Sequence, residues 1–252
     1  MIRRILLFIL TLGWTFLGQA VSPEDNEIIS KFQKIQSRGD FVEKTVRRIG
    51  KQTLELESFI SEEADLKVVP KVFAAFGDYG KWALAGINVK PKGGRYYVQI
   101  LDLVPEPSDP TILQLRLSLE FPLYHSKLMC RIKMKTTQEA GVTTVRATMI
   151  QTPDSIVESA EGFLKIFKSP QADNRAWFYV KAYVTLRVWL LYEMVPLPVM
   201  TREAGERIQM IVSNYQKEED RRLLASSIAT KNPKPPPPAS KSNQSPKGKK
   251  GE

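Results

Sequence analysis

Few residues of this sequence have side chains suited to acid–base or nucleophilic chemistry. The 252 residues contain one histidine, His125, and one cysteine, Cys130. A Ser-His-Asp or Cys-His arrangement would have to include His125, which lies in an expected turn, Tyr124-His125-Ser126. Neither a partner nor a cavity position is visible for it, so the sequence does not predict catalysis there. Cys130 shares an apolar strand face with Leu128 and Ile132, and we expect its thiol to be part of the core.

The sequence also lacks the patterns that bind metals or phosphates. One cysteine and one histidine cannot form a structural zinc site, and a single cysteine excludes an intrachain disulfide. No glycine-rich phosphate loop, EF-hand loop or paired-carboxylate motif is present. Arg38-Gly39-Asp40 matches an adhesion tripeptide, but we interpret it as the end of a helix. We therefore expect no cofactor, no metal and no enzymatic activity.

The first twenty residues have the pattern of a secretory signal peptide. Arg3 and Arg4 are basic, residues 5–18 are apolar, and Gly18-Gln19-Ala20 offers small residues for cleavage. The apolar run of 14 residues is short for a membrane span, which needs about 20. We expect a periplasmic or secreted protein, and an uncleaved N-terminal anchor is the alternative. A single unpaired cysteine is compatible with an oxidising compartment.

The net charge of +10 is concentrated at the ends of the chain. Residues 231–252 hold six lysines and one acid around the run Pro235–Pro238, without a large apolar residue. This composition predicts an extended, disordered tail. Because the charge lies in the tail, we do not expect nucleic-acid binding. The tail is either a solvated spacer or a peripheral contact with an anionic membrane or cell-wall polymer.

Helices are expected at both ends of the body. Ser22 is a suitable cap and Pro23 suits a first turn, followed by apolar residues at helical spacing: Ile28, Ile29, Phe32 and Ile35. A helical patch begins near Pro70, and a second short helix or turn begins at Asp78 and ends by Gly86. After Pro196-Leu197-Pro198, a long helix is expected with Thr201 as its cap.

Strands are expected between these helices. Residues 111–121 alternate Leu113, Leu115, Leu117, Leu119 and Phe121 with polar residues, which is the period of a strand. Further strand patterns cover residues 41–49, 53–60, 96–103, 127–135, 142–151, 157–167 and 176–190. Turn residues separate the later ones, at 107–110, 139–141 and 170–174. Neighbouring strands without helices between them predict an antiparallel meander.

The expected strand 176–190 carries aromatic residues on one face: Trp177, Tyr179, Tyr183 and Trp189. One interpretation is a membrane-interface or partner-binding strip, because Trp and Tyr favour such boundaries. The other is that the N-terminal helix packs on this face. We favour the second, because Phe32 and its apolar neighbours need a surface on which to be buried.

This order of elements resembles the helix-grip fold of the START-like superfamily, also called SRPBCC, which includes polyketide cyclases, coenzyme Q-binding proteins and lipid-transfer domains. Residues 69–82 are similar to the family's stretch after the first strand. Residues 194–198 resemble its proline-rich entry into the last helix, and residues 204–219 resemble that helix. The resemblance covers about residues 50–225. It implies an α+β fold with a curved antiparallel sheet around a long C-terminal helix, here with an extra N-terminal helix.

The residue patterns and the resemblance together divide the chain. Residues 1–20 would be the signal peptide, 21–50 the N-terminal helix and an extra strand-like segment, 51–229 the START-like domain, and 230–252 the tail. The helix, the extra segment and the tail depart from the family's pattern.

The helix-grip fold implies an apolar cavity between the sheet and the last helix, of about 300–1,000 Å³. Each CH₂ buried there would contribute about 0.8 kcal/mol to binding. The alternative interpretation is that each of these residues packs in a filled core and lines no cavity. Strand alternation and the helix stripe give the candidates, with the first three expected near the mouth: Phe73, Phe76, Trp82, Leu115, Leu117, Leu119, Ile132, Phe178, Val180, Val184, Leu186, Ile208, Ile211, Val212 and Tyr215.

These features predict a binding module for a hydrophobic ligand, namely a lipid, sterol, quinone or polyketide, with transfer between membranes as a further role. Two alternatives remain open. One is a structural or envelope-assembly protein with a filled core. The other is a cyclase or dehydratase on the same fold, which the nearly all-aliphatic inward strand positions disfavour.

Overall fold

A computed structural model describes most of the chain. The described residues are 22–39, 41–87, 97–121, 124–151, 157–170, 172, 174–194 and 196–231. The expected signal peptide and the tail after residue 231 lie outside the described residues.

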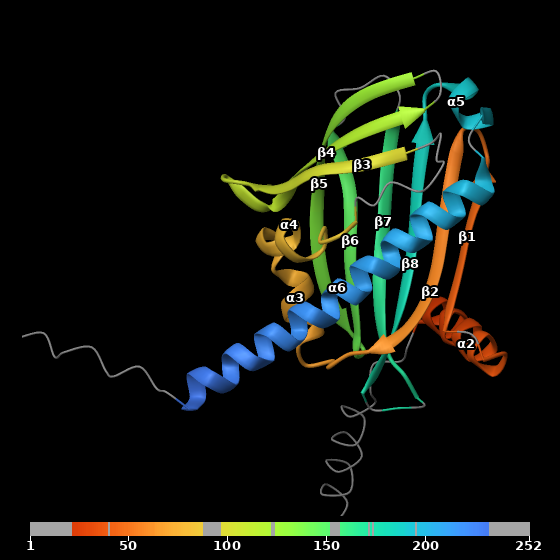
Figure 1. The fold of residues 1–252 in the computed structure, drawn as a ribbon. Coiled ribbons are helices and arrows are strands. Elements are labelled where there is room, and N and C mark those ends of the chain that lie inside the picture. The colour runs from red at the N-terminus through yellow and green to blue at the C-terminus, as the bar shows by residue number, and fades with distance from the viewer. Residues whose placement is uncertain are drawn as a thin grey trace, which may run out of the picture. The chain divides into compact units, whose positions relative to one another are not determined.

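An eight-stranded antiparallel sheet is the centre of the fold (Figure 1). Its strand order is β1-β2-β8-β7-β6-β5-β4-β3, so the predicted meander runs from β3 to β8 and β2 pairs with β8. The strands are β1 (Val42–Ile49), β2 (Thr53–Glu63), β3 (Tyr97–Glu106), β4 (Asp109–Phe121), β5 (Tyr124–Glu139), β6 (Val142–Gln151), β7 (Val157–Lys168) and β8 (Arg175–Leu186). The expected extra segment is the edge strand β1 of this same sheet.

The helices are α2 (Pro23–Ser37), α3 (Val69–Ala74), a 3-10 turn (Phe76–Asp78), α4 (Tyr79–Trp82), α5 (Trp189–Met194) and α6 (Leu197–Lys231). The compact body extends to Glu219, and Asp220 begins a second unit that contains the end of α6. No described helix combines the length and the apolar character needed to cross a bilayer.

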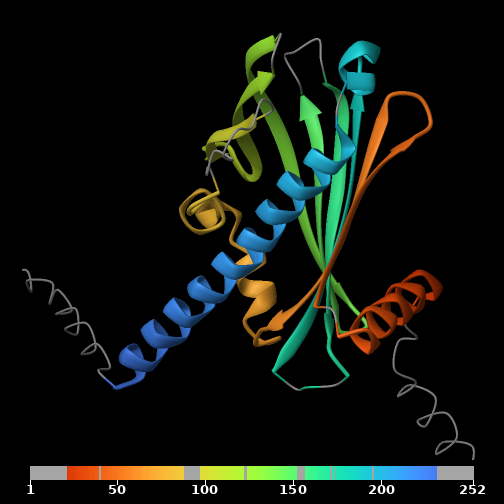
Figure 2. The same ribbon diagram turned by 45° about the vertical axis from the view of Figure 1, so that its right-hand side comes forward.

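Helices lie on both faces of the sheet (Figure 2). We call the face toward α3, α4 and α6 the inner face, and the opposite face the outer face. On the inner face, Val212 and Tyr215 of α6 join a core cluster with Phe73 of α3. On the outer face, Phe32 of α2 stacks on Trp177 with ring centroids 4.8 Å apart. The body is therefore an α+β helix-grip fold with an extra N-terminal helix, as the sequence predicted.

Local chemistry explains the start of α2 and the hairpin between β5 and β6. The Ser22 hydroxyl accepts a hydrogen bond from the Asp25 backbone N–H at 3.1 Å, as expected of a helix cap. Ala140 and Gly141 both have positive φ, 48° and 79°. This conformation suits a two-residue turn between twisted antiparallel strands.

Two predictions near residue 190 are wrong. The strand expected over 176–190 ends at Leu186, and Trp189–Met194 forms α5. Arg48 donates hydrogen bonds to the carbonyl oxygens of Tyr192 and Glu193, both at 2.9 Å, which satisfies the end of this short helix. The long helix begins at Leu197 because Pro198 suits a first turn. Thr201 lies inside it and accepts a hydrogen bond from the Val46 N–H.

His125 lies in strand β5 rather than in a turn. The strand begins at Tyr124, and His125 stands opposite Glu120 of β4. Its side chain is exposed, so it does not face the core. Cys130 is buried, as predicted.

Candidate ligand-binding site

The inner face has two parts, and the first is a filled core. We call it the packed half, and it contains Ile60, Leu113, Ile166 and Phe178, each at most 2% exposed. Tyr215 of α6 lies on these strands, with its ring centroid 5.9 Å from that of Phe178. Packing of this kind leaves no room for a ligand among these side chains.

Six of the predicted lining residues belong to the packed half: Phe73, Phe76, Trp82, Phe178, Val212 and Tyr215. The first three were expected near a mouth, but each is at most 8% exposed. Phe73 stacks on Tyr215 at 5.1 Å and meets the Trp82 ring edge-on at 5.6 Å. The short helices α3 and α4 thus place their aromatic faces on the core.

The second part of the inner face carries small apolar residues that remain half-buried. We call it the open half, and its centre is one row across three strands: Ala147 of β6, Gly162 of β7 and Ala182 of β8. Ala160, Val180 and Val184 flank this row, and all six residues are half-buried. They share the strand face of Val145, Ile166 and Phe178, so they point to the inner side. Of the six, Ala147 also packs against the packed half, and Val184 packs against a cluster that contains Leu54 and Leu186.

Two apolar clusters border the open half. One contains Leu128 and Cys130 with Leu115, Leu117 and Met149 around them, and we call it the rim. The other joins Leu54, Leu186 and Tyr192 to the start of α6. Among the predicted lining residues, Leu115 and Leu117 are half-buried at the rim, and Val180 and Val184 are half-buried beside the central row. Ile132, Ile208 and Ile211 are half-buried and pack against the packed half, whereas Leu186 is buried in the second cluster. Leu119 stands opposite Ser126, and its side chain lies outside the described part.

The helix α6 is fixed by polar contacts along its length as well as by packing. Asn214 donates hydrogen bonds to the carbonyl oxygens of Ala83 and Ala85, at 3.4 and 2.7 Å. Gln216 donates to the Glu63 carbonyl at 3.1 Å. Near its start, Gly205 lies against Lys44, because a Cβ at Gly205 would come within 1.9 Å of the lysine Cδ. These contacts hold α6 on the inner face of the sheet.

The open half offers little acid–base chemistry. Its strand positions are alanine, glycine and valine, and none carries a carboxylate or an imidazole. In the packed half, the Tyr79 hydroxyl donates to the Phe73 carbonyl at 2.6 Å, and burial raises the pKa of Tyr79 above its ordinary value of 10.0. In the described part of the chain, no group of three or more His, Cys, Asp or Glu side chains could hold a metal ion.

A few inward polar residues were missed in the sequence. Lys44 and Ser58 stand opposite each other on β1 and β2, on the inner side. Ser58 is fully buried, and its hydroxyl has no hydrogen-bond partner. The alternation of β1 shows that Val42, Lys44, Val46 and Arg48 share one strand face. Whether this face points inward could not be known before the pairing of β1 with β2.

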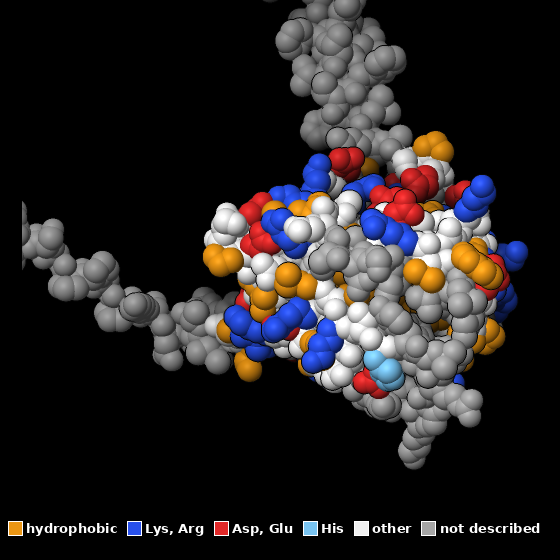
Figure 3. Space-filling model, turned by 90° about the horizontal axis from the view of Figure 1, so that it is seen from above, with side chains coloured by type: hydrophobic (Ala, Val, Ile, Leu, Met, Phe, Trp, Pro, Cys, Tyr) orange, Lys and Arg blue, Asp and Glu red, His pale blue; other side chains and the backbone are white. Residues whose placement is uncertain are grey.

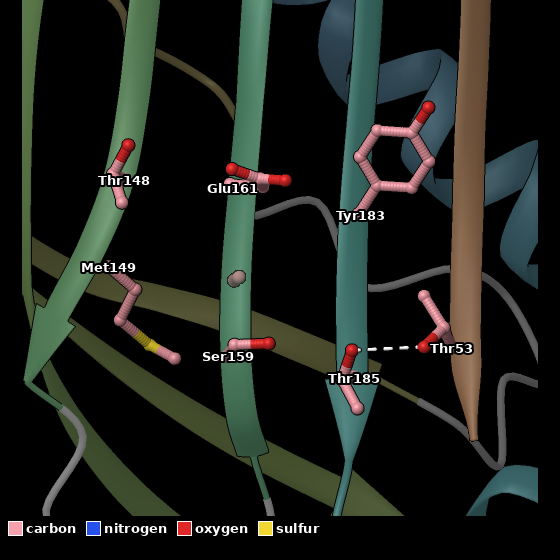
Figure 4. Close-up of a pocket in the computed structure, with 8 residues that line it drawn as sticks. Thr53, Thr148, Met149, Ser159, Glu161, Tyr183 and Thr185 are labelled. Atoms are coloured by element: carbon pink, nitrogen blue, oxygen red, sulfur yellow. Dashed lines mark hydrogen bonds between the residues drawn. The ribbon is translucent and has the colours of Figure 1, made fainter. Parts of the chain in front are cut away.

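The outer face contains a separate pocket with a volume of about 480 Å³ (Figure 4). Six of its lining residues are polar: Thr53, Thr148, Ser159, Glu161, Tyr183 and Thr185. They come from four neighbouring strands, β2, β6, β7 and β8, with α6 behind the sheet in this view. Tyr183 was expected under the N-terminal helix with Trp177 and Tyr179. Only Trp177 and Tyr179 are buried beneath α2, and Trp189 is 64% exposed on α5.

The rest of this face is bridged by ion pairs across strands. Glu55 of β2 pairs with Arg47 of β1 and lies 3.5 Å from Lys181 of β8. Burial acts to raise the pKa of Glu55, but the hydrogen bond from Arg47 and the charge of Lys181 outweigh it and hold this pKa below its ordinary value. Seen from above in Figure 3, the surface of the molecule has basic and acidic side chains interspersed rather than gathered in one basic patch.

No family model matches this chain, and no curated protein does. Solved structures are similar to it at low identity. One is described as a START superfamily protein from Mycobacterium smegmatis, with 14% identity and a TM-score of 0.39, over 66% of this chain and 97% of that one. Another is described as a STAR-related lipid transfer protein from Xanthomonas axonopodis, with 11% identity and a TM-score of 0.40, over 71% and 94% of the two chains.

An enzyme is also among the similar structures. It is norcoclaurine synthase from Thalictrum flavum, with 14% identity and a TM-score of 0.38, over 68% of this chain and 93% of that one.

Proposed function

We propose that this protein binds a hydrophobic molecule at the open half of its inner face, beside α6. The observation that carries the proposal is the half-buried row Ala147, Gly162 and Ala182, which points to the inner side. Apolar surface left accessible within a concave site gains free energy when a ligand covers it, at about 25 cal/mol per Å². Apolar residues of α6, Ile208 and Ile211, would contact the ligand from the other side.

The chemistry of the open half favours a binding role over catalysis. A ligand there would meet alkyl groups and no pair of acid and base. The ligand class is therefore a lipid, sterol, quinone or polyketide, with transfer between membranes as a further role.

The packed half favours a second candidate function, that of a structural or assembly protein, because most of its aromatic side chains already contact one another.

A matched pair of variants tests the location of the site. Ala182→Phe places a ring on the open half, whereas Thr148→Phe places the same ring on the outer face. We expect Ala182→Phe to weaken binding of the apolar fluorophore N-phenylnaphthylamine at least tenfold, which is roughly 1.4 kcal/mol. Thr148→Phe should bind like the wild type. Equal binding by both variants, with native-like unfolding transitions, would count against the site.

We further propose that the protein is exported and that its basic tail attracts it to anionic surfaces. The support is the pattern of residues 1–20 and the six lysines of residues 231–252. Truncation after Thr230 should reduce cosedimentation with phosphatidylglycerol vesicles at low salt and have little effect at high salt. Unchanged cosedimentation would leave the tail a spacer.

A further inference from the structure

The outer face divides into three zones with different chemistry. Near α2, aromatic side chains such as Phe59 and Tyr179 are buried beneath the helix. Beside them, long charged side chains pair across strands, as in Arg47–Glu55–Lys181. In the third zone, short hydroxyl side chains leave the pocket of about 480 Å³ shown in Figure 4. This volume is within the range of small-molecule sites.

Several polar groups of the pocket have no partner in the protein. Among the described residues, the hydroxyls of Thr148 and Ser159 form no hydrogen bond, and the Glu161 carboxylate forms no ion pair. The Thr53 hydroxyl donates to the Lys51 carbonyl at 3.3 Å and accepts from the Thr185 hydroxyl at 3.0 Å, so these two hydroxyls keep acceptor lone pairs for a ligand. The pocket therefore presents donors and acceptors that a ligand with several hydroxyl groups would pair with.

The charge of the pocket lining favours a neutral ligand over an anionic one. Its lining contains one carboxylate and neither lysine nor arginine. The neighbouring cations already have partners in the protein. Lys181 lies 3.5 Å from Glu55, Lys133 opposite Thr148 lies 2.6 Å from Asp109, and the Arg146 guanidinium lies 5.8 Å from the centre of the Phe163 ring. A phosphate would meet the Glu161 charge without compensation, whereas a neutral hydroxyl can donate to it.

We propose that this outer-face pocket binds a neutral sugar, as a free saccharide or as part of a glycan. The hydroxyls of Thr148 and Ser159 and the Glu161 carboxylate would pair with the sugar hydroxyls, and Tyr183 would supply apolar surface. The pocket and the open half lie on opposite faces of the same strands, so this site is independent of the hydrophobic ligand proposed above.

The test is a titration of the full, ¹⁵N-labelled chain followed by amide chemical shifts. The probes are glucose, N-acetylglucosamine and the tetramer of N-acetylglucosamine, with glycerol and inorganic phosphate as controls. We expect saturable shifts at residues 159–161 and 183–185 with a sugar, and none with phosphate. Stronger binding of the tetramer than of the monomers would identify a glycan, and equal binding a free saccharide.

Variants assign the shifts to the pocket. Thr148→Val with Ser159→Ala removes two hydroxyls at nearly constant shape and should weaken binding about tenfold. Thr144→Val, on the same face of β6 but outside the pocket, should bind normally, as should Ala182→Phe. The proposal is overturned by an absence of saturable shifts with every sugar, by saturation with phosphate instead, or by normal sugar affinity of the double variant.

Discussion

The packed half and the open half of the inner face lie on the same strands and follow the same alternation, but only one of them is filled. On β8, Phe178 is fully buried, whereas Val180 and Ala182, one and two steps further along the same face, are half-buried. The difference comes from side-chain size and from which helices lie above. In the packed half, α3, α4 and α6 bring aromatic rings onto large strand residues. In the open half, the strands present alanine, glycine and valine.

The largest expected effect is a difference in unfolding free energy between two leucine-to-alanine variants, one in the packed half and one at the rim of the open half. Leu113 of β4 is 2% exposed in the packed half, and Leu115 is half-buried at the rim. Leu113→Ala should cost about 3–5 kcal/mol of unfolding free energy, because the surrounding core cannot collapse into the cavity. Leu115→Ala should cost about 1–2 kcal/mol, because less surface is buried there. Urea denaturation of both variants measures the difference, and equal losses would mean that the two halves are equally packed.

A smaller effect is expected at the centre of the open half. A Cβ at Gly162 would lie 2.9 Å from the Ala182 Cβ and 3.0 Å from the Lys181 carbonyl oxygen. Gly162→Ala should therefore destabilise the protein by about 1–3 kcal/mol. Ala182→Gly in the same chain should restore part of the loss, since it removes the nearer contact. A double-mutant cycle by thermal unfolding measures this coupling, and additive effects would contradict the close approach of β7 and β8.

The smallest expected effect lies on the outer face and depends on pH. The pKa of Glu55 is lower in the folded protein than its ordinary value of 4.5, so the unfolded chain binds a proton first as the pH falls. The contribution of Glu55 to stability is thus present above pH 4.5 and is lost below it, as the pH falls through the folded pKa. Glu55→Gln should have a shallower loss of melting temperature below pH 4.5 than the wild type. Parallel curves for both proteins would show that the Arg47–Glu55–Lys181 contacts add nothing.

The sequence predicted the architecture well because the strands alternate clearly and the order of elements is distinctive. It also predicted that Phe32 covers Trp177 and Tyr179, since the apolar stripe of α2 needed a surface. It failed where local pattern and tertiary context diverge. Residues 189 and 190 were taken as the end of a strand, but they begin a helix that Arg48 from a distant strand completes.

The candidate site was predictable only in part. Alternation identified which residues face inward, so Leu115, Val180 and Ile211 were correctly placed on the inner side. It could not separate Phe178 from Val180, because burial depends on the position of α6 along the sheet. It also passed over Ala147 and Ala182, since small residues give a weak apolar signal, although their size is what leaves this half open.

The most direct test of the account is native mass spectrometry, combined with solvent extraction, of the protein purified from its own cells. If the open half binds a hydrophobic molecule, the wild type should carry an extractable lipid, sterol, quinone or polyketide near unit stoichiometry, and Ala182→Phe should be free of it. A ligand-free wild type that takes up nothing from a lipid mixture would contradict the account and favour a structural or assembly role.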